Sequence, residues 1–261
     1  MQYENIIFQK ANQVAVIKFN RPKAFNAVNV ELFTDIIKAL EVCAEDRDVK
    51  VIVLTGEGKA FCAGGDVALF NSSPDVSGIL RELTKYLHFT IVGIRRTSKP
   101  FIAMINGTAA GAGVSIAAAC DLRICASSVK FRQAYTSIGL IPDGAWTLMV
   151  PLLIGLGKAS ELVYLDPVFD AKDALQMGLV NKVVEDSELE KTTMDIALKL
   201  AAGPTVSYSI VKENFNNAFF GLLERQLEQE RRGMVWAGKT TDAKEGVAAF
   251  VGKRKPSFKG Q

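Results

Sequence analysis

Two glycine-rich turns are the segments of this chain whose residue types and spacing could do chemistry. Phe61-Cys62-Ala63-Gly64-Gly65-Asp66 follows the apolar run VKVIVLTG, and the turn INGTAAGAG at 105–113 follows KPFIAM. Small residues let a ligand approach the main chain. The second turn leads into a helix-like run, VSIAAAC, so its free N–H groups and the positive end of the helix dipole face the same way. Two such turns can present N–H groups to one oxygen, which is the physical basis of an oxyanion hole.

The elements around these turns predict a layered α/β core. The amino-terminal run IIFQKANQVAVIKFN is typical of a hairpin, and VKVIVLTG predicts a strand covered on both faces. Apolar residues at helical spacing predict a helix over 29–45, capped by Asn29, and another over 79–96 that stops at Lys99-Pro100. Strand, turn and helix then repeat through LRICAS to PLLIGLGKASELVYL, which favours right-handed crossovers.

The pattern changes after residue 165, because the chain from Asp170 onward is almost wholly helical by sequence. We therefore expect a core over residues 1–195 and a helical carboxyl-terminal region over residues 196–261. A helical region of this kind on an α/β core either folds back as a lid or docks on a neighbouring subunit.

Composition excludes several classes of function. The net charge of +3 over 261 residues is mild, and only Lys253-Arg254-Lys255 forms a basic run, so no nucleic-acid footprint is expected. Four cysteines without CxxC spacing and a single histidine argue against a zinc site and predict buried thiols in a reducing compartment. The amino terminus lacks a secretion signal, and glycines and charges interrupt the apolar stretch 101–126, so we expect a cytoplasmic protein without a membrane span.

Over nearly its full length the chain resembles the enoyl-CoA hydratase/isomerase (crotonase) superfamily. The resemblance rests on ordered motifs: Phe19-Asn20-Arg21-Pro22, AFCAGGD at 60–66, Ile105-Asn106-Gly107, Cys120-Asp121-Leu122 and Glu245-Gly246. It implies a core of repeated ββα units, a helical trimerisation region and an acyl-CoA thioester substrate, with no cofactor beyond the CoA of the substrate. The implied assembly is a homotrimer or a hexamer formed as a dimer of trimers.

The resemblance also implies that the N–H groups of Gly65 and Ala112 form the oxyanion hole. The two positions that hold glutamates in the hydratases of the family are Ser115 and Tyr135 in this chain. Neither can serve as a carboxylate base, so simple water addition loses both expected catalysts. A hydratase-type lyase nevertheless stays among the alternatives.

Asp143 takes the position of the single acid of the peroxisomal-type Δ3,Δ2-enoyl-CoA isomerases and of the aspartate of 4-chlorobenzoyl-CoA dehalogenase. On its own an Asp-Gly pair is typical of a plain turn, but with both glutamates missing we interpret Asp143 as the acid/base of an isomerase. His88 lies where the dehalogenase has its histidine. An aryl-CoA dehalogenase or hydrolase using Asp143 and His88 is therefore an alternative, as is an exposed, uninvolved His88.

The remaining candidates bind substrate. The resemblance assigns the residues expected to line the CoA and acyl groups, with the last two possibly from a neighbouring subunit: Ala24, Ala63, Gly64, Asp66, Val67, Tyr135, Phe250 and Lys253. The acyl group is expected to be apolar, on the evidence of Val67, Leu69, Phe70, Leu83, Leu87 and Phe89. A non-catalytic acyl-CoA-binding scaffold is the alternative from a different class, although the small residues of both turns argue against it.

Overall fold

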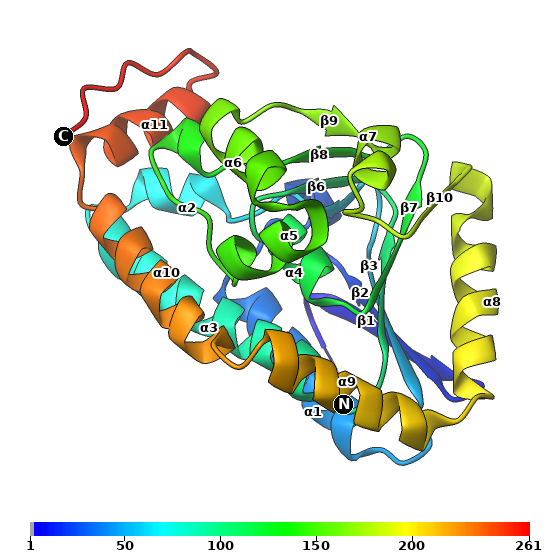
Figure 1. Ribbon diagram of the computed structural model, residues 1–261. Coiled ribbons are helices and arrows are strands. Elements are labelled where there is room, and N and C mark those ends of the chain that lie inside the picture. Colours follow the sequence, from blue (N-terminus) through cyan, green and yellow to red (C-terminus); the bar gives the residue numbers. More distant parts are fainter. Residues whose placement is uncertain (1–2) are drawn as a thin grey trace.

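The computed structural model describes residues 3–261 and shows two β-sheets surrounded by helices (Figure 1). The larger sheet has the strand order β1-β2-β3-β5-β7-β10, and the smaller has the order β4-β6-β8-β9. The strands of the larger sheet are β1 (Ile6–Ala11), β2 (Val14–Phe19), β3 (Val51–Gly56), β5 (Phe101–Ile105), β7 (Leu122–Ala126) and β10 (Lys182–Val184). Those of the smaller are β4 (Ala60–Cys62), β6 (Thr108–Ala110), β8 (Lys130–Arg132) and β9 (Phe169–Asp170). The predicted α/β class is confirmed.

Successive strands alternate between the two sheets. Each of β3, β5 and β7 belongs to the larger sheet, and the strand that follows it (β4, β6 or β8) belongs to the smaller one. Neighbours within this repeat are parallel: β3 with β5, β5 with β7, β4 with β6 and β6 with β8. The predicted amino-terminal hairpin forms as the antiparallel pair β1 and β2. This alternation is the expected ββα repeat, and it brings the ends of β4 and β6 to one edge.

Burial explains why these segments form the core. Every residue of β3 is buried, as its uninterrupted apolar run predicts. Helix α1 (Val30–Glu45) buries an apolar face, and its Asn29 cap accepts a hydrogen bond from the Leu32 N–H at 3.0 Å. Helix α3 (Val76–Arg96) begins three residues before the predicted helix, because Asp75 caps it through the Gly78 N–H.

The remaining helices lie around the two sheets. Helices α4 (Ala112–Ala119), α5 (Trp146–Ile154) and α6 (Leu156–Leu165) lie at the centre of the molecule, and α8 (Leu189–Ala201) covers the opposite face of the larger sheet (Figure 1). Helix α10 (Leu223–Ala237) runs along α3. The others are α2 (Val67–Ser72), α7 (Ala171–Gln176), α9 (Thr205–Phe219), α11 (Thr241–Val251), and the short 3-10 helices η1 (Pro22–Ala24), η2 (Thr136–Ile138) and η3 (Asp186–Glu188).

The carboxyl-terminal region is helical, as predicted. Residues 205–237 form the two helices α9 and α10, which the non-helical residues 220–222 connect. The expected boundary at residues 195 and 196 falls inside α8, so the division into two regions stays a prediction.

Candidate active site

The two glycine-rich turns lie against each other. Strands β4 and β6, which precede them, are parallel, with Ala60 opposite Thr108 and Cys62 opposite Ala109. A side chain on Gly111 would meet the Gly64 Cα at 3.4 Å, and one on Gly64 would meet the Ala110 carbonyl oxygen at 3.1 Å. Both glycines also have positive φ, at 97° for Gly64 and 51° for Gly111. Glycine is therefore required here for conformation and for close approach at once.

The N–H groups of Gly65 and Ala112 are left free by this arrangement. Among the backbone hydrogen bonds of residues 3–261, neither N–H donates to a carbonyl, whereas the flanking Asp66 N–H donates to Val28 at 3.1 Å. Ala112 is the first residue of α4, where N–H groups have no partner within the helix. Helix α4 is seated closely on the first turn, because a side chain on Gly113 would lie 2.2 Å from the Cys62 carbonyl oxygen. The structure thus brings together both residues predicted for the oxyanion hole.

A narrow apolar cavity of about 80 Å³ opens beside these N–H groups, and we call it the acyl cavity. Gly65 and Ala112 line it, and so do Val67, Phe70, Leu83 and Leu87 from the region expected to meet the acyl group. Leu69 and Phe89 from the same region are exposed and lie outside it. Asp143 is the one carboxylate among the described residues that line the acyl cavity.

Asp143 is 1% exposed and lies in the turn before α5. Its Oδ1 is 2.9 Å from His88 Nε2, which comes from α3. With Asp143 in its carboxylate form, Nε2 is the donor of this hydrogen bond, because a carboxylate can only accept one. The predicted pair of Asp143 and His88 is therefore in direct contact, although 55 residues separate them along the chain.

Ser115 and Tyr135 hold the backbone of Asp143. Ser115 Oγ donates to the Asp143 carbonyl oxygen at 2.6 Å, and the Tyr135 hydroxyl donates to the same oxygen at 3.4 Å. Burial, followed by the nearby Asp143 carboxylate, raises the pKa of Tyr135 well above 10. Tyr135 therefore remains a neutral hydroxyl that positions the turn.

Glu230 is a residue of this site that sequence reasoning missed. It lies on α10, is 3% exposed, and accepts hydrogen bonds from the Ala145 N–H at 2.6 Å, from the Thr147 N–H at 2.9 Å and from the Thr147 hydroxyl. It therefore caps α5 from another helix. Burial, then the proximity of Asp143, raises the pKa of Glu230 to about 8. Its sequence surroundings, LERQLEQERRG, carry no signal of burial because they are typical of an exposed helix.

The residues predicted to bind CoA divide into two groups. Ala63, Gly64, Val67, Tyr135 and Phe250 line the acyl cavity, and Phe250 reaches it from α11 of the same chain, which packs on α2.

Ala24, Asp66 and Lys253 lie outside the acyl cavity. Asp66 pairs with Arg21 at 3.0 Å beside the first turn, and Lys253 is exposed. Contact of these three with the nucleotide part of CoA stays a prediction.

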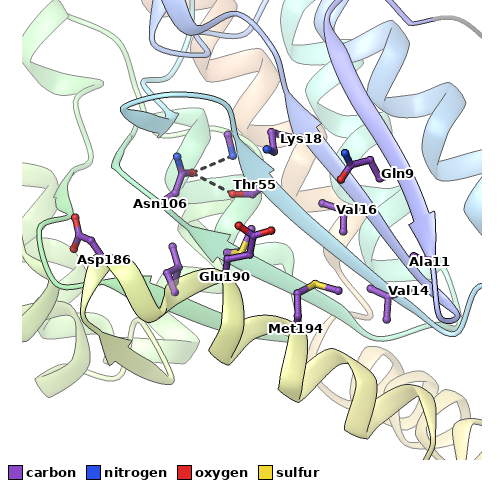
Figure 2. Close-up of a pocket in the computed structure, with 13 residues that line it drawn as sticks. Gln9, Ala11, Val14, Val16, Lys18, Thr55, Asn106, Asp186, Glu190 and Met194 are labelled. Atoms are coloured by element: carbon purple, nitrogen blue, oxygen red, sulfur yellow. Dashed lines mark hydrogen bonds between the residues drawn. The ribbon is translucent and has the colours of Figure 1, made fainter.

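A second cavity, of about 310 Å³, lies between the larger sheet and α8 (Figure 2). Lys18, Thr55, Asn106 and Glu190 point toward it (Figure 2). Asn106 Oδ1 already accepts hydrogen bonds from the Thr55 hydroxyl and the Gly56 N–H, and Lys18 pairs with Glu57 at 3.2 Å. This cavity is larger than the acyl cavity, but its polar groups mainly serve the fold and it contains none of the predicted site residues.

Residues 3–261 contain neither a cluster of metal-ligating side chains nor a membrane-spanning helix. No group of three or more His, Cys, Asp or Glu side chains in this range is arranged to hold a metal ion. No helix in the same range combines the length and the apolar character needed to cross a membrane.

Known proteins share this fold. The family model described as "Enoyl-CoA hydratase/isomerase" matches residues 9–261. The chain is 33% identical over 260 residues to a 1,2-epoxyphenylacetyl-CoA isomerase of Escherichia coli, and 36% identical over 261 residues to a crotonyl-CoA hydratase of Syntrophomonas wolfei, with 99% of each chain covered in both cases. A crystal structure of an enoyl-CoA hydratase from Mycobacterium avium subsp. paratuberculosis superposes with a TM-score of 0.90 at 30% identity, covering 99% of this chain and 100% of that one.

The fold and the paired turns thus define an enzyme of the crotonase superfamily. The chain belongs to the enoyl-CoA hydratase/isomerase family. The resemblance inferred from the sequence motifs is confirmed at this level. The names of the relatives include both a hydratase and an isomerase.

Proposed function

We propose that this protein is a Δ3,Δ2-enoyl-CoA isomerase in which Asp143 is the acid/base. The observation that carries the proposal is that Asp143 is the one carboxylate lining the acyl cavity among the described residues, alongside the free N–H groups of Gly65 and Ala112. One carboxylate is enough for an isomerisation, because the same group can remove a proton from one carbon and return it to another.

The reaction follows from the geometry of the site. The thioester carbonyl oxygen of a 3-enoyl-CoA accepts hydrogen bonds from Gly65 and Ala112. Asp143 removes a proton from C2, and the electrons of the broken C–H bond pass into a dienolate whose negative oxygen the two N–H groups stabilise. Protonated Asp143 then delivers the proton to C4, which leaves the double bond between C2 and C3.

Hydration is less well supported by the same site. Water addition requires a base that activates water, and the positions of the family's two glutamates hold Ser115 and Tyr135. Both hydroxyls are directed to the Asp143 carbonyl oxygen, and the raised pKa of Tyr135 keeps its hydroxyl neutral. Ser115 and Tyr135 therefore position the turn that carries Asp143, and they do not supply the carboxylates that hydration requires.

The test is isomerisation of 3-hexenoyl-CoA, followed by the absorbance of the conjugated 2-enoyl thioester. We expect Asp143→Asn to lose about 10³-fold or more in kcat, because loss of a general acid/base removes roughly 10²- to 10⁴-fold. Asp195→Asn is the matched control, since Asp195 is exposed on α8 and its one salt bridge within residues 3–261 is with Lys191. No conversion by the wild type, or full activity of the Asp143→Asn variant, would reject the proposal.

Aryl-CoA hydrolysis is a second candidate, favoured by the 2.9 Å contact between His88 and Asp143. In that reaction Asp143 would form an ester with the ring carbon, releasing halide, and His88 would activate water to cleave the ester. Chloride release from 4-chlorobenzoyl-CoA distinguishes it from isomerisation. Binding of both thioesters without turnover would instead indicate a scaffold.

We further propose that the acyl-CoA enzyme assembles as a trimer, alone or as a pair of trimers, through exposed apolar residues on two sides of α9. Val206 and Ile210 on one side of the helix, and Phe215 and Phe219 on the opposite side, are each more than half exposed. Apolar patches of this kind mark association surfaces. Sedimentation of the purified protein measures the assembly.

A further inference from the structure

His88 lies between the acyl cavity and a separate outer groove. Its Nε2 contacts Asp143, which lines the acyl cavity, while the histidine itself lines the groove and its side chain is 14% exposed. The outer groove is formed by residues of α3 and α10: Gly78, Arg81, Glu82, Lys85, His88, Phe89 and Arg231. None of these residues lines the acyl cavity. The contacting pair of His88 and Asp143 therefore separates the acyl cavity from the outer groove.

The same contact makes the two oxygens of Asp143 unequal. Oδ1 is engaged by His88, whereas Oδ2 has no hydrogen bond to a side chain or backbone group among residues 3–261. Exchanging the two oxygens takes a rotation about the Cβ–Cγ bond, which breaks the contact with His88, while Ser115 and Tyr135 hold the backbone carbonyl oxygen in place. Oδ2 is thus the oxygen available to a substrate in the acyl cavity.

Close packing also keeps the turn against α3. Gly144, which follows Asp143 at a φ of 72°, has room for no side chain: an added Cβ would lie 2.9 Å from Leu87 Cδ2 and 3.0 Å from Ser115 Cβ. Leu87 precedes His88 on α3, so the helix that supplies the histidine also fixes the backbone next to the aspartate. In this packing His88 is the polar link from the carboxylate to the groove.

We propose that His88 is a positioning residue that holds Asp143 Oδ1 and closes the acyl cavity toward the outer groove. The proton taken from C2 therefore stays on Oδ2 and is returned to C4 without exchange with water. The C2–H bond breaks as Oδ2–H forms, and Oδ2–H breaks as C4–H forms, so the proton count balances on one oxygen. This inference rests on the proposed isomerase activity.

The contact itself can be tested without turnover, because His88 is the one histidine of the chain. Nitrogen-15 labelling of histidine gives a single imidazole spectrum, which we expect to show the tautomer with hydrogen on Nε2. Asp143→Asn should change that spectrum, while Asp195→Asn should not. The inference would be overturned if the wild-type spectrum showed hydrogen on Nδ1 only. It would also be overturned if the Asp143→Asn substitution left the spectrum unchanged.

The closure is tested with 3-hexenoyl-CoA deuterated at C2 and converted in ordinary water, with deuterium at C4 of the product measured by mass spectrometry. The wild type should carry over most of the label. His88→Gln keeps a donor near the Nε2 position and should keep both the transfer and kcat within about 5-fold. His88→Ala opens the cavity to the groove, and we expect transfer to fall at least about 5-fold and kcat at least about 10-fold.

Lys85→Ala is the matched control, because it widens the outer groove without touching Asp143. It should leave label transfer and kcat as in the wild type. The proposed closure would be overturned if His88→Ala transferred as much deuterium to C4 as the wild type does. It would also be overturned if the wild type exchanged all its label with water. If the wild type forms no 2-enoyl product, the proposed isomerase activity is rejected. That result differs from both outcomes that overturn the closure. The imidazole spectrum then still tests the contact between His88 and Asp143.

Discussion

Replacing Glu230 by glutamine removes a buried carboxyl group whose charged state the fold disfavours. The pKa of Glu230 is raised from 4.5 to about 8, first by burial and then by Asp143. A group with a raised pKa contributes fully to stability below pH 4.5, where both folded and unfolded chains hold the proton. That contribution is lost as the pH rises toward 8, because the unfolded chain releases its proton first.

The size of this pH-dependent loss of stability follows from the two pKa values, 4.5 and about 8. At about 1.4 kcal/mol for each pKa unit, the full loss is on the order of 5 kcal/mol, of which roughly 3 to 4 kcal/mol falls between pH 5 and pH 8. Glutamine has nearly the same shape, stays neutral throughout, and retains an oxygen that can accept from the N–H groups of Ala145 and Thr147. The free energy of unfolding of Glu230→Gln, relative to that of the wild type, should therefore increase by that amount across this range.

Urea unfolding at pH 5, 6, 7 and 8, at one fixed protomer concentration, measures this difference. Glu228→Gln is the matched control on the same helix: Glu228 pairs with Arg231 and Arg232, which lower its pKa, so its replacement should give no increase between pH 5 and 8. In an Asp143→Asn background the effect should shrink, since one cause of the raised pKa is gone. A difference between Glu230→Gln and wild type that stays flat or falls with pH would refute the reasoning.

Two further predictions concern the paired turns. Gly65→Pro deletes one N–H of the oxyanion hole and should lower kcat roughly 10²- to 10³-fold, measured with 3-hexenoyl-CoA; unchanged turnover would remove Gly65 from the hole. Gly113→Ala would force a methyl group to within 2.2 Å of the Cys62 carbonyl oxygen, so we expect a loss of about 1 to 3 kcal/mol or more in the free energy of unfolding by urea titration. Gly157→Ala, with nothing within 4 Å of its added Cβ, is the matched control and should not lower the free energy of unfolding, because alanine is favoured over glycine in a helix.

Local patterns predicted those parts of the structure that depend on neighbours in sequence. The apolar run of β3 and the Asn29 cap of α1 carry their own signals, because burial on both faces and capping are read from a few adjacent residues. The paired turns were also predictable, since parallel strands place both turns at one edge.

Contacts made between distant elements could not be predicted in the same way. The burial of Glu230 depends on α10 docking beside α5, and nothing within LERQLEQERRG reports that docking. The contact of His88 with Asp143 was expected only through family resemblance, because a sequence separation of 55 positions sets no distance between them. The separation of α9 from α10 carries no clear sequence signal although Gly221 lies within it, because the flanking residues continue the helical pattern.

The shared carbonyl of Asp143 bears on how sites of this family can interconvert. Ser115 and Tyr135 both donate to that oxygen. An ionised glutamate at either position would instead face it with acceptors only, and would remove one of the two donors that hold the aspartate. Positions 115, 135 and 143 are therefore physically coupled: a single substitution toward a two-glutamate site, at 115 or at 135, would loosen the turn that carries the aspartate.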